Sequence, residues 1–82
     1  MYKILTTAPS ERPYAITPSD TVELNPVPKA IYVGTGGNIA LQGVNSTTSV
    51  IFKNVANGQI IDVRALKVLA TGTTATDIIG MA

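Results

Sequence analysis

The chain has 82 residues, of which 45% are hydrophobic and only 13% are charged, and its formal net charge is +1. It contains no cysteine and no histidine, which excludes disulfides and nearly excludes a structural zinc site. A domain of this length buries only about 60% of the surface that its unfolded chain exposes, and small domains often compensate by oligomerising. Typical soluble domains have about 25% charged residues, and depletion of charge is typical of buried interfaces. We therefore expect a single small domain that forms homo-oligomers.

The distribution of charge argues against two classes of partner. The basic residues are scattered along the chain and no aromatic residues alternate with them, whereas a nucleic-acid-binding module needs a concentrated basic face. No apolar run reaches the 18 or more residues of a membrane span. The first eight residues lack the apolar region of a signal peptide, which predicts synthesis in a cytoplasm. We expect no nucleic-acid partner and no membrane partner.

Residues 1–13 show no sustained hydrophobic period and contain Pro9 and Pro13. They are interpreted as an extended N-terminal arm, in which Tyr2 and Ile4 are available to pair with a neighbouring chain. Residues 14–82 are interpreted as a single β-domain.

From Tyr14 onward, short apolar segments alternate with turn residues at a spacing of roughly eight to ten residues, which is typical of an all-β sandwich or barrel. No segment has the three- and four-residue apolar spacing of a helix. We therefore predict an all-β fold, a small sandwich or barrel of about eight short antiparallel strands. The expected strands are residues 14–16, 21–24, 30–33, 39–41, 49–55, 60–63, 66–71 and 76–80.

Alternation along these segments predicts which side chains point into the core. Residues two apart share a face of a strand, as Ile39 and Leu41 do. Ile61 and Val63 share one side but Leu66 and Val68 share the other, so we expect a bulge or bend at Ala65. The predicted core residues are Ile39, Leu41, Val50, Phe52, Ile61, Val63, Val68 and Ile78.

Three turn signals predict hairpins. Asn57-Gly58 is typical of a two-residue hairpin turn in which both residues have positive φ. Gly34–Gly37 has the glycines of a phosphate-binding loop, but it lacks the Lys-Ser/Thr of such loops and no helix follows, so a hairpin turn is favoured. The third turn contains Gly72, between two apolar segments of which Val68 and Ile78 are expected to be buried. We predict that this closing hairpin forms the central strand pair of the core.

The residue types offer little for catalysis. A glycosidase needs two carboxylates that face one cleft, and a calcium or magnesium site needs several oxygen ligands close together. The only carboxylates are Glu11, Asp20, Glu23, Asp62 and Asp77, and there is no histidine or cysteine to act as a base or nucleophile. We predict no catalytic residue, no cofactor and no metal site. Asn45-Ser46-Thr47 fits the glycosylation pattern, which matters only in a secretory pathway.

The residues leave two alternatives to a structural role. Tyr14 and Tyr32 could stack on a sugar, as in a small carbohydrate- or receptor-binding β-module. An inhibitor or accessory domain of an enzyme would be monomeric and more highly charged, so the composition argues against it.

Four blocks of sequence carry a family resemblance. They are residues 15–20 (AITPSD), 28–34 (PKAIYVG), 50–58 (VIFKNVANG) and 68–79 (VLATGTTATDII). In this order and spacing the chain resembles the spike base proteins of tailed bacteriophages and gene transfer agents from Tyr14 to Ile79. The resemblance implies a homo-oligomeric virion protein at the capsid vertices, with the major capsid protein and a spike fibre protein as partners. Related small β-proteins act as capsid cement or decoration proteins. The resemblance implies no catalytic or ligand-binding residue.

Overall fold

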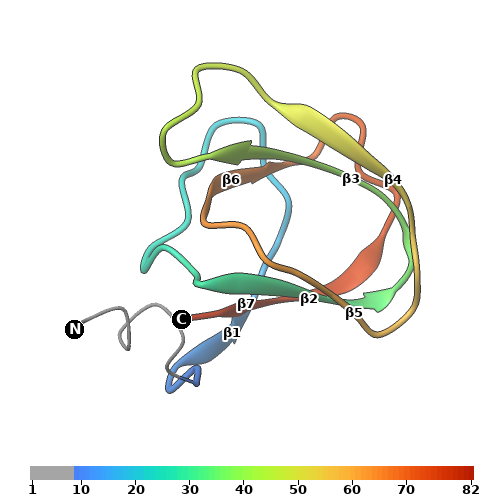
Figure 1. Ribbon diagram of the computed structural model, residues 1–82. Coiled ribbons are helices and arrows are strands. Elements are labelled where there is room, and N and C mark those ends of the chain that lie inside the picture. Colours follow the sequence, from blue (N-terminus) through green and yellow to red (C-terminus); the bar gives the residue numbers. More distant parts are fainter. Residues whose placement is uncertain (1–8) are drawn as a thin grey trace.

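The computed structural model describes residues 9–82, and it shows two antiparallel β-sheets that face each other across a core (Figure 1). One sheet has the strand order β1-β7-β2-β5 and the other has the order β4-β3-β6. The strands are β1 (Pro13–Ala15), β2 (Ala30–Thr35), β3 (Gly37–Gly43), β4 (Val50–Val55), β5 (Gln59–Ile61), β6 (Ala65–Leu69) and β7 (Thr76–Met81). The predicted all-β class is confirmed. The described residues include no helix long and apolar enough to cross a membrane.

The three expected hairpins are corners at which the chain passes from one sheet to the other. β2 continues into β3, β4 into β5 and β6 into β7, and each pair divides between the two sheets. All three corners lie at the same end of the sandwich (Figure 1). The prediction of a closing hairpin between β6 and β7 was therefore wrong. β7 pairs instead with β1 and β2, and β6 pairs with β3.

The Asn57-Gly58 turn also differs from its prediction. The Gln59 N–H donates to the Ala56 carbonyl oxygen at 3.2 Å, and Gly58 has a φ of 75°, but Asn57 is not among the residues with positive φ. Positive φ at the third residue alone is the pattern of a type II turn, which also favours glycine there. The two turn types share this glycine, so the dipeptide did not distinguish a hairpin from a corner.

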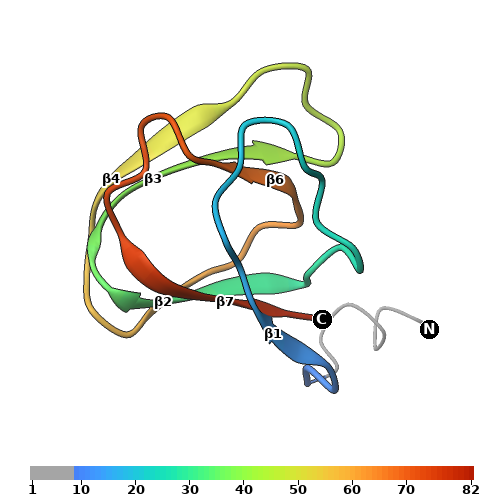
Figure 2. The same cartoon turned by 180° about the vertical axis from the view of Figure 1, so that it is seen from behind.

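The expected strand at residues 21–24 does not form. This part of the β1–β2 connection runs along β6, where the Ser19 N–H donates to the Val68 carbonyl at 2.8 Å and the Leu24 N–H to the Leu66 carbonyl at 2.7 Å. The connection crosses between the sheets and is seen from behind in Figure 2. Nearby prolines at positions 18, 26 and 28 lack the N–H needed for a continuous ladder. These two bonds cover part of the edge of β6.

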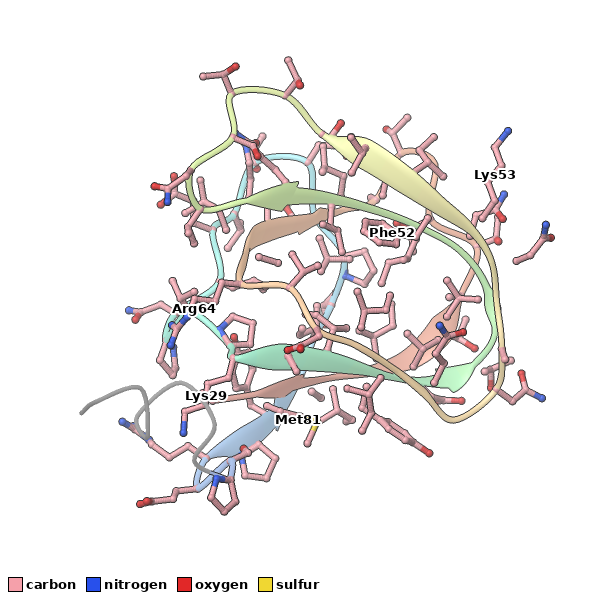
Figure 3. The ribbon with its side chains drawn as sticks, in the orientation of Figure 1. Lys29, Phe52, Lys53, Arg64 and Met81 are labelled. Atoms are coloured by element: carbon pink, nitrogen blue, oxygen red, sulfur yellow. The ribbon has the colours of Figure 1, made fainter. Side chains whose placement is uncertain are left out.

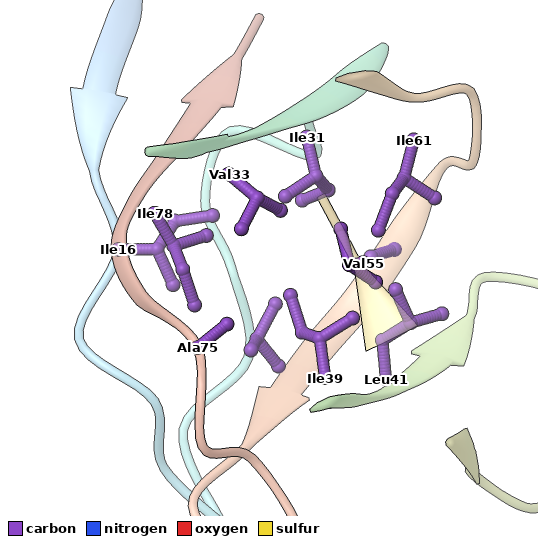
Figure 4. Packing of buried hydrophobic residues seen from close by; sticks show 11 residues of the cluster. Ile16, Ile31, Val33, Ile39, Leu41, Val55, Ile61, Ala75 and Ile78 are labelled. Atoms are coloured by element: carbon purple, nitrogen blue, oxygen red, sulfur yellow. The ribbon is translucent and has the colours of Figure 1, made fainter. Parts of the chain in front are cut away.

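The core lies between the two sheets and takes side chains from both (Figure 4). Its buried members are Ile16, Ile31, Val33, Ile39, Leu41, Val55, Ile61, Ala65, Val68, Ala75 and Ile78. Phe52 and Val63 are partly buried and pack against this cluster. Val50 was predicted to be a core residue, but 55% of its side chain is exposed. It is the first residue of β4, an edge strand, and has a strand neighbour on only one side, at Leu41.

Two shifts in the register of strand pairing keep the core side chains of β4 and β6 pointing inward. The pairing of β3 with β6 shifts between Gln42, opposite Lys67, and Gly43, opposite Ala65. The extra residue in β6 lets Ala65 and Val68, three apart, both face the core, which confirms the bulge expected at this position. A second shift, between β3 and β4, brings Val55 inward, and Asn54 within it has a φ of 59°.

The expected N-terminal arm is described only in part. Residues 1–8, with Tyr2 and Ile4, lie outside the described residues. The N–H groups of Glu11 and Arg12 both donate to the carbonyl oxygen of Ala82, at 2.8 and 3.0 Å. The described end of the arm is thus bonded to the end of the chain, next to β1.

Candidate assembly surface

The five carboxylates do not assemble into a site. Among residues 9–82 no group of three or more acidic side chains could hold a metal ion. Two of these carboxylates accept hydrogen bonds from neighbouring threonines, and both sets of bonds are structural. Asp77 accepts a hydrogen bond from the Thr35 hydroxyl at 2.9 Å, across β7 and β2. Asp20 accepts two bonds from Thr71, one from its N–H at 2.9 Å and one from its hydroxyl at 2.7 Å.

Asp20 therefore ties the β1–β2 connection to the β6–β7 corner. The hydrogen bond from the Thr71 hydroxyl, followed by the bond from its N–H, lowers the pKa of Asp20 below the ordinary 3.8, because both favour the charged carboxylate. The same corner explains the run of threonines that follows. The hydroxyl oxygens of Thr73 and Thr74 accept hydrogen bonds from the N–H groups of Ala40 and Asn38, each at 2.9 Å. These threonines hold the corner against β3.

The two tyrosines considered for sugar binding lie on opposite faces of the four-stranded sheet. Tyr14 is opposite Gly80 and Gly80 is opposite Ile31, which places Tyr14 on the inner face. Its hydroxyl donates to the Pro26 carbonyl at 2.6 Å, and burial raises the pKa of Tyr14 above 10.0. Tyr32 is on the outer face. The pair cannot form one stacking platform, so no observation favours the carbohydrate-binding alternative.

The structure also places the glycine-rich corner at Gly34–Gly37 and the glycosylation pattern at residues 45–47. The N–H of Gly36, which would face an anion in a phosphate loop, donates to the Asn57 side-chain oxygen at 2.6 Å. This bond joins the β2–β3 corner to the β4–β5 corner. Asn45, Ser46 and Thr47 are exposed in the β3–β4 loop.

The outer face of the four-stranded sheet is the most distinctive surface of the molecule. Residues opposite one another on neighbouring strands share a face. One outer row crosses all four strands as Ala15, Ile79, Tyr32 and Ile60, and the next row contains Pro13, Met81 and Ala30. Met81 points away from the other sheet in Figure 3. Six residues of these two rows form a surface that we call the sheet patch: Ala15, Ala30, Tyr32, Ile60, Ile79 and Met81.

The sheet patch contains no charged residue, although it faces away from the core. Ile60 is 54% exposed and Tyr32 is 37% exposed. A sheet with one face in water normally alternates apolar and polar residues, whereas strands covered on both faces have continuous apolar runs. β2 and β7 have such runs, in Ala30–Val33 and in residues 78–81. Exposed apolar patches of this kind mark interaction surfaces.

Two further exposed apolar residues lie on the other sheet. Val50 and Ile51, which we call the β4 patch, are neighbours on the edge strand β4 and are 55% and 49% exposed. They point to opposite sides of the strand, because Val50 lies opposite the inward-facing Leu41. Ile51 is opposite Ala40, on the outer face of its sheet, while Ile39 and Leu41 face inward. Lys53 follows on the same strand and points away from the molecule, whereas Phe52 lies between the sheets (Figure 3).

The comparison with solved structures gives a full-length match. The matching chain belongs to a solved structure of the capsid of a native gene transfer agent (GTA) particle, and that capsid structure was computed with C5 symmetry. The two chains are 38% identical, the match covers 100% of each, and the TM-score is 0.84. The chain belongs to the family of this GTA capsid chain. Neither the known protein-family models nor the curated proteins give a match.

Membership of this GTA capsid family confirms the resemblance at the level of a capsid-related protein. The sequence did not predict the exposed residues of the sheet patch and the β4 patch. Val50 was predicted to lie in the core, and Tyr32 was interpreted only as a residue that could stack on a sugar. One signal was present: the continuous apolar runs of β2 and β7 indicate strands that are covered on both faces.

Proposed function

We propose that the chain is a non-enzymatic structural subunit of a phage-like virion, bound to the capsid as a head spike base or decoration (cement) protein. The observation that carries this proposal is the match, over the full length of both chains, to a GTA capsid chain at 38% identity.

The apolar outer surfaces support an assembly role. A domain with exposed, uncharged patches on both sheets gains stability when other subunits cover them. In this role the chain oligomerises and either anchors a spike fibre or stabilises the shell. Its partners are copies of itself, the major capsid protein and a spike fibre protein, and its location is the virion after synthesis in the host cytoplasm.

The test is to purify particles from a producing strain and measure the copies of this chain per particle by quantitative mass spectrometry. A spike base should be present in a small multiple of the number of capsid vertices, and density for it should lie at the vertices. A cement protein should approach the copy number of the major capsid protein. Absence of the chain from purified particles would exclude both roles.

A further inference from the structure

Each sheet ends in two edge strands, and among these β4 has the longest uncovered edge. The edge strands are β1 and β5 of one sheet and β4 and β6 of the other. β4 has six residues, whereas β1 and β5 have three each. Part of the edge of β6 is covered by the hydrogen bonds from Ser19 and Leu24. Within residues 9–82, no segment pairs with the outer edge of β4, and such an edge is a template for a strand from another chain.

The uncovered edge of β4 presents the backbone groups of Ile51. The Ala40 N–H donates to the Thr73 hydroxyl oxygen at 2.9 Å, so Ala40 directs its N–H towards the β6–β7 corner and away from β4. Successive residues of a strand direct their N–H and C=O groups to opposite edges. Leu41 therefore directs its backbone groups to β4, towards Val50 opposite it. Ile51 lies opposite Ala40, so its own N–H and C=O point outward from the sheet.

The side chains of the β4 patch also lack a neighbouring strand on the outer side. Val50 points inward, because it lies opposite the inward-facing Leu41, and yet it is 55% exposed. Ile51 points to the outer face of its sheet and is 49% exposed. A strand added beside β4 flanks both side chains at once and continues the core beyond Val50.

The charge on β4 indicates the chemistry of the partner. Lys53 is the only charged residue from position 44 to position 61, and it is exposed and points away from the molecule (Figure 3). A second β4 strand would bring another lysine and no carboxylate, and residues 1–8 likewise contain Lys3 and no carboxylate. Opposite charges across an interface favour a partner and like charges disfavour it. The strand that fits this edge therefore comes from a different protein.

We propose that β4 accepts an extended segment of a second particle protein as an added strand, bonded to the backbone of Ile51 and with an Asp or Glu beside Lys53. In this mode of recognition the main-chain bonds provide affinity, and side chains at alternate positions provide specificity. The proposal rests on the virion role proposed above, and it adds the kind of contact and the chemistry of the partner. The contact is separate from the sheet patch, which lies on the other sheet.

Hydrogen exchange tests the backbone bond directly. Exchange of single amides is measured by mass spectrometry with electron-transfer fragmentation, in the isolated native chain and in purified particles. The Ile51 N–H should exchange more slowly in the particle by about tenfold or more. The Val50 N–H, which faces β3, is the reference and should exchange slowly in both states. An Ile51 N–H that exchanges equally fast in both states overturns the proposal.

Two substitutions separate the backbone bond from contact with the side chain. Ile51→Pro removes the outward N–H and leaves the pairing of β4 with β3 in place, because proline is tolerated on edge strands where the N–H faces solvent. Ile51→Thr keeps the N–H and changes only the side chain. Circular dichroism and thermal unfolding check that both variants are folded.

Quantitative mass spectrometry of purified particles then measures how much of each variant is incorporated. The proline variant should be lost from the particles, and the threonine variant should retain more incorporation than the proline variant. A folded Ile51→Pro chain that joins particles as the native chain does overturns the proposal. The exchange measurement uses the native chain, so it decides the proposal whether or not the proline variant folds.

A carbodiimide identifies the partner, because it forms an amide bond between a lysine amine and a carboxylate. In purified particles Lys53 should crosslink to an Asp or Glu of a different protein. Lys53→Glu should lower incorporation, and Arg64→Glu is the control for net charge, because Arg64 is exposed and lies outside β4. A crosslink from Lys53 to a carboxylate of another copy of this chain, or equal incorporation of the two charge variants, overturns the proposed partner.

These outcomes are distinguishable from a failure of the proposed function. Absence of the chain from purified particles overturns the virion role and the strand addition together. If the chain is present in particles but its Ile51 N–H exchanges as fast as in the isolated chain, only the strand addition fails and the virion role stands.

Discussion

At the scale of single residues, the corners depend on close contacts between backbones. A Cβ atom on Gly36 would overlap the carbonyl oxygen of Val55, and it would lie 3.0 Å from the backbone nitrogen of Asn57. Backbone atoms cannot move aside as a flexible side chain can. We expect Gly36→Ala to lower the free energy of unfolding by about 1 to 3 kcal/mol, measured by urea denaturation. Gly43→Ala is the control, because its nearest contact is the Ser46 hydroxyl at 3.2 Å. An equal loss in both variants would contradict this account.

Gly58 tests the conformation of the turn rather than its packing. Its φ is 75°, and the nearest atom to an added Cβ is the Tyr32 hydroxyl oxygen at 3.8 Å, so there is room for a side chain. The cost of Gly58→Val should come from the left-handed backbone and amount to about 1 kcal/mol or more. An unchanged melting temperature would show that the chain adopts another turn at this position without strain.

Asp20 should make the stability of the fold decrease at acid pH. Its hydrogen bonds from Thr71 hold the folded-state pKa below the ordinary 3.8. Its contribution is therefore complete above that value and is lost as the pH falls through the folded-state pKa. We expect the unfolding midpoint of the native chain to approach that of Asp20→Asn as the pH falls below 3.8. A difference between the two proteins that is constant from neutral to acid pH would exclude this role.

At the scale of elements, the sequence predicts the strands better than their pairing. Glycines and β-branched runs indicated the strands β6 and β7 and a turn at Gly72 between them. They did not show that β6 and β7 lie in different sheets, because a glycine with positive φ suits a corner as well as a hairpin. Pairing depends on contacts between distant segments, such as β7 with β1 and β2. A local pattern has no information on those contacts.

The correction changes the meaning of a double substitution in β6 and β7. Val68 is 1% exposed and Ile78 is 3% exposed, and each comes from a different sheet. Truncating a buried Ile to Ala costs about 2 to 5 kcal/mol, against a usual total stability of about 5 to 15 kcal/mol. Val68→Ala with Ile78→Ala should leave the isolated chain largely unfolded by circular dichroism and unable to join a particle.

The matched control for this pair is Val50→Ala with Ile51→Ala, which removes similar atoms from the exposed β4 patch. We expect this control to stay folded, because exposed substitutions usually change stability by no more than about 0.5 kcal/mol each. Normal particle assembly by the Val68/Ile78 variant would show that these two residues are peripheral to the fold.

At the scale of the whole molecule, composition and patterning predicted the class of the protein and missed its surfaces. Low charge and small size indicated a β-domain that associates with others, and the sandwich has two uncharged patches that suit this role. The position of each patch depends on the order of strands in the sheets. Ile60 and Ile79 are far apart in the sequence, and only the pairing of β5 and β7 with β2 brings them into one row.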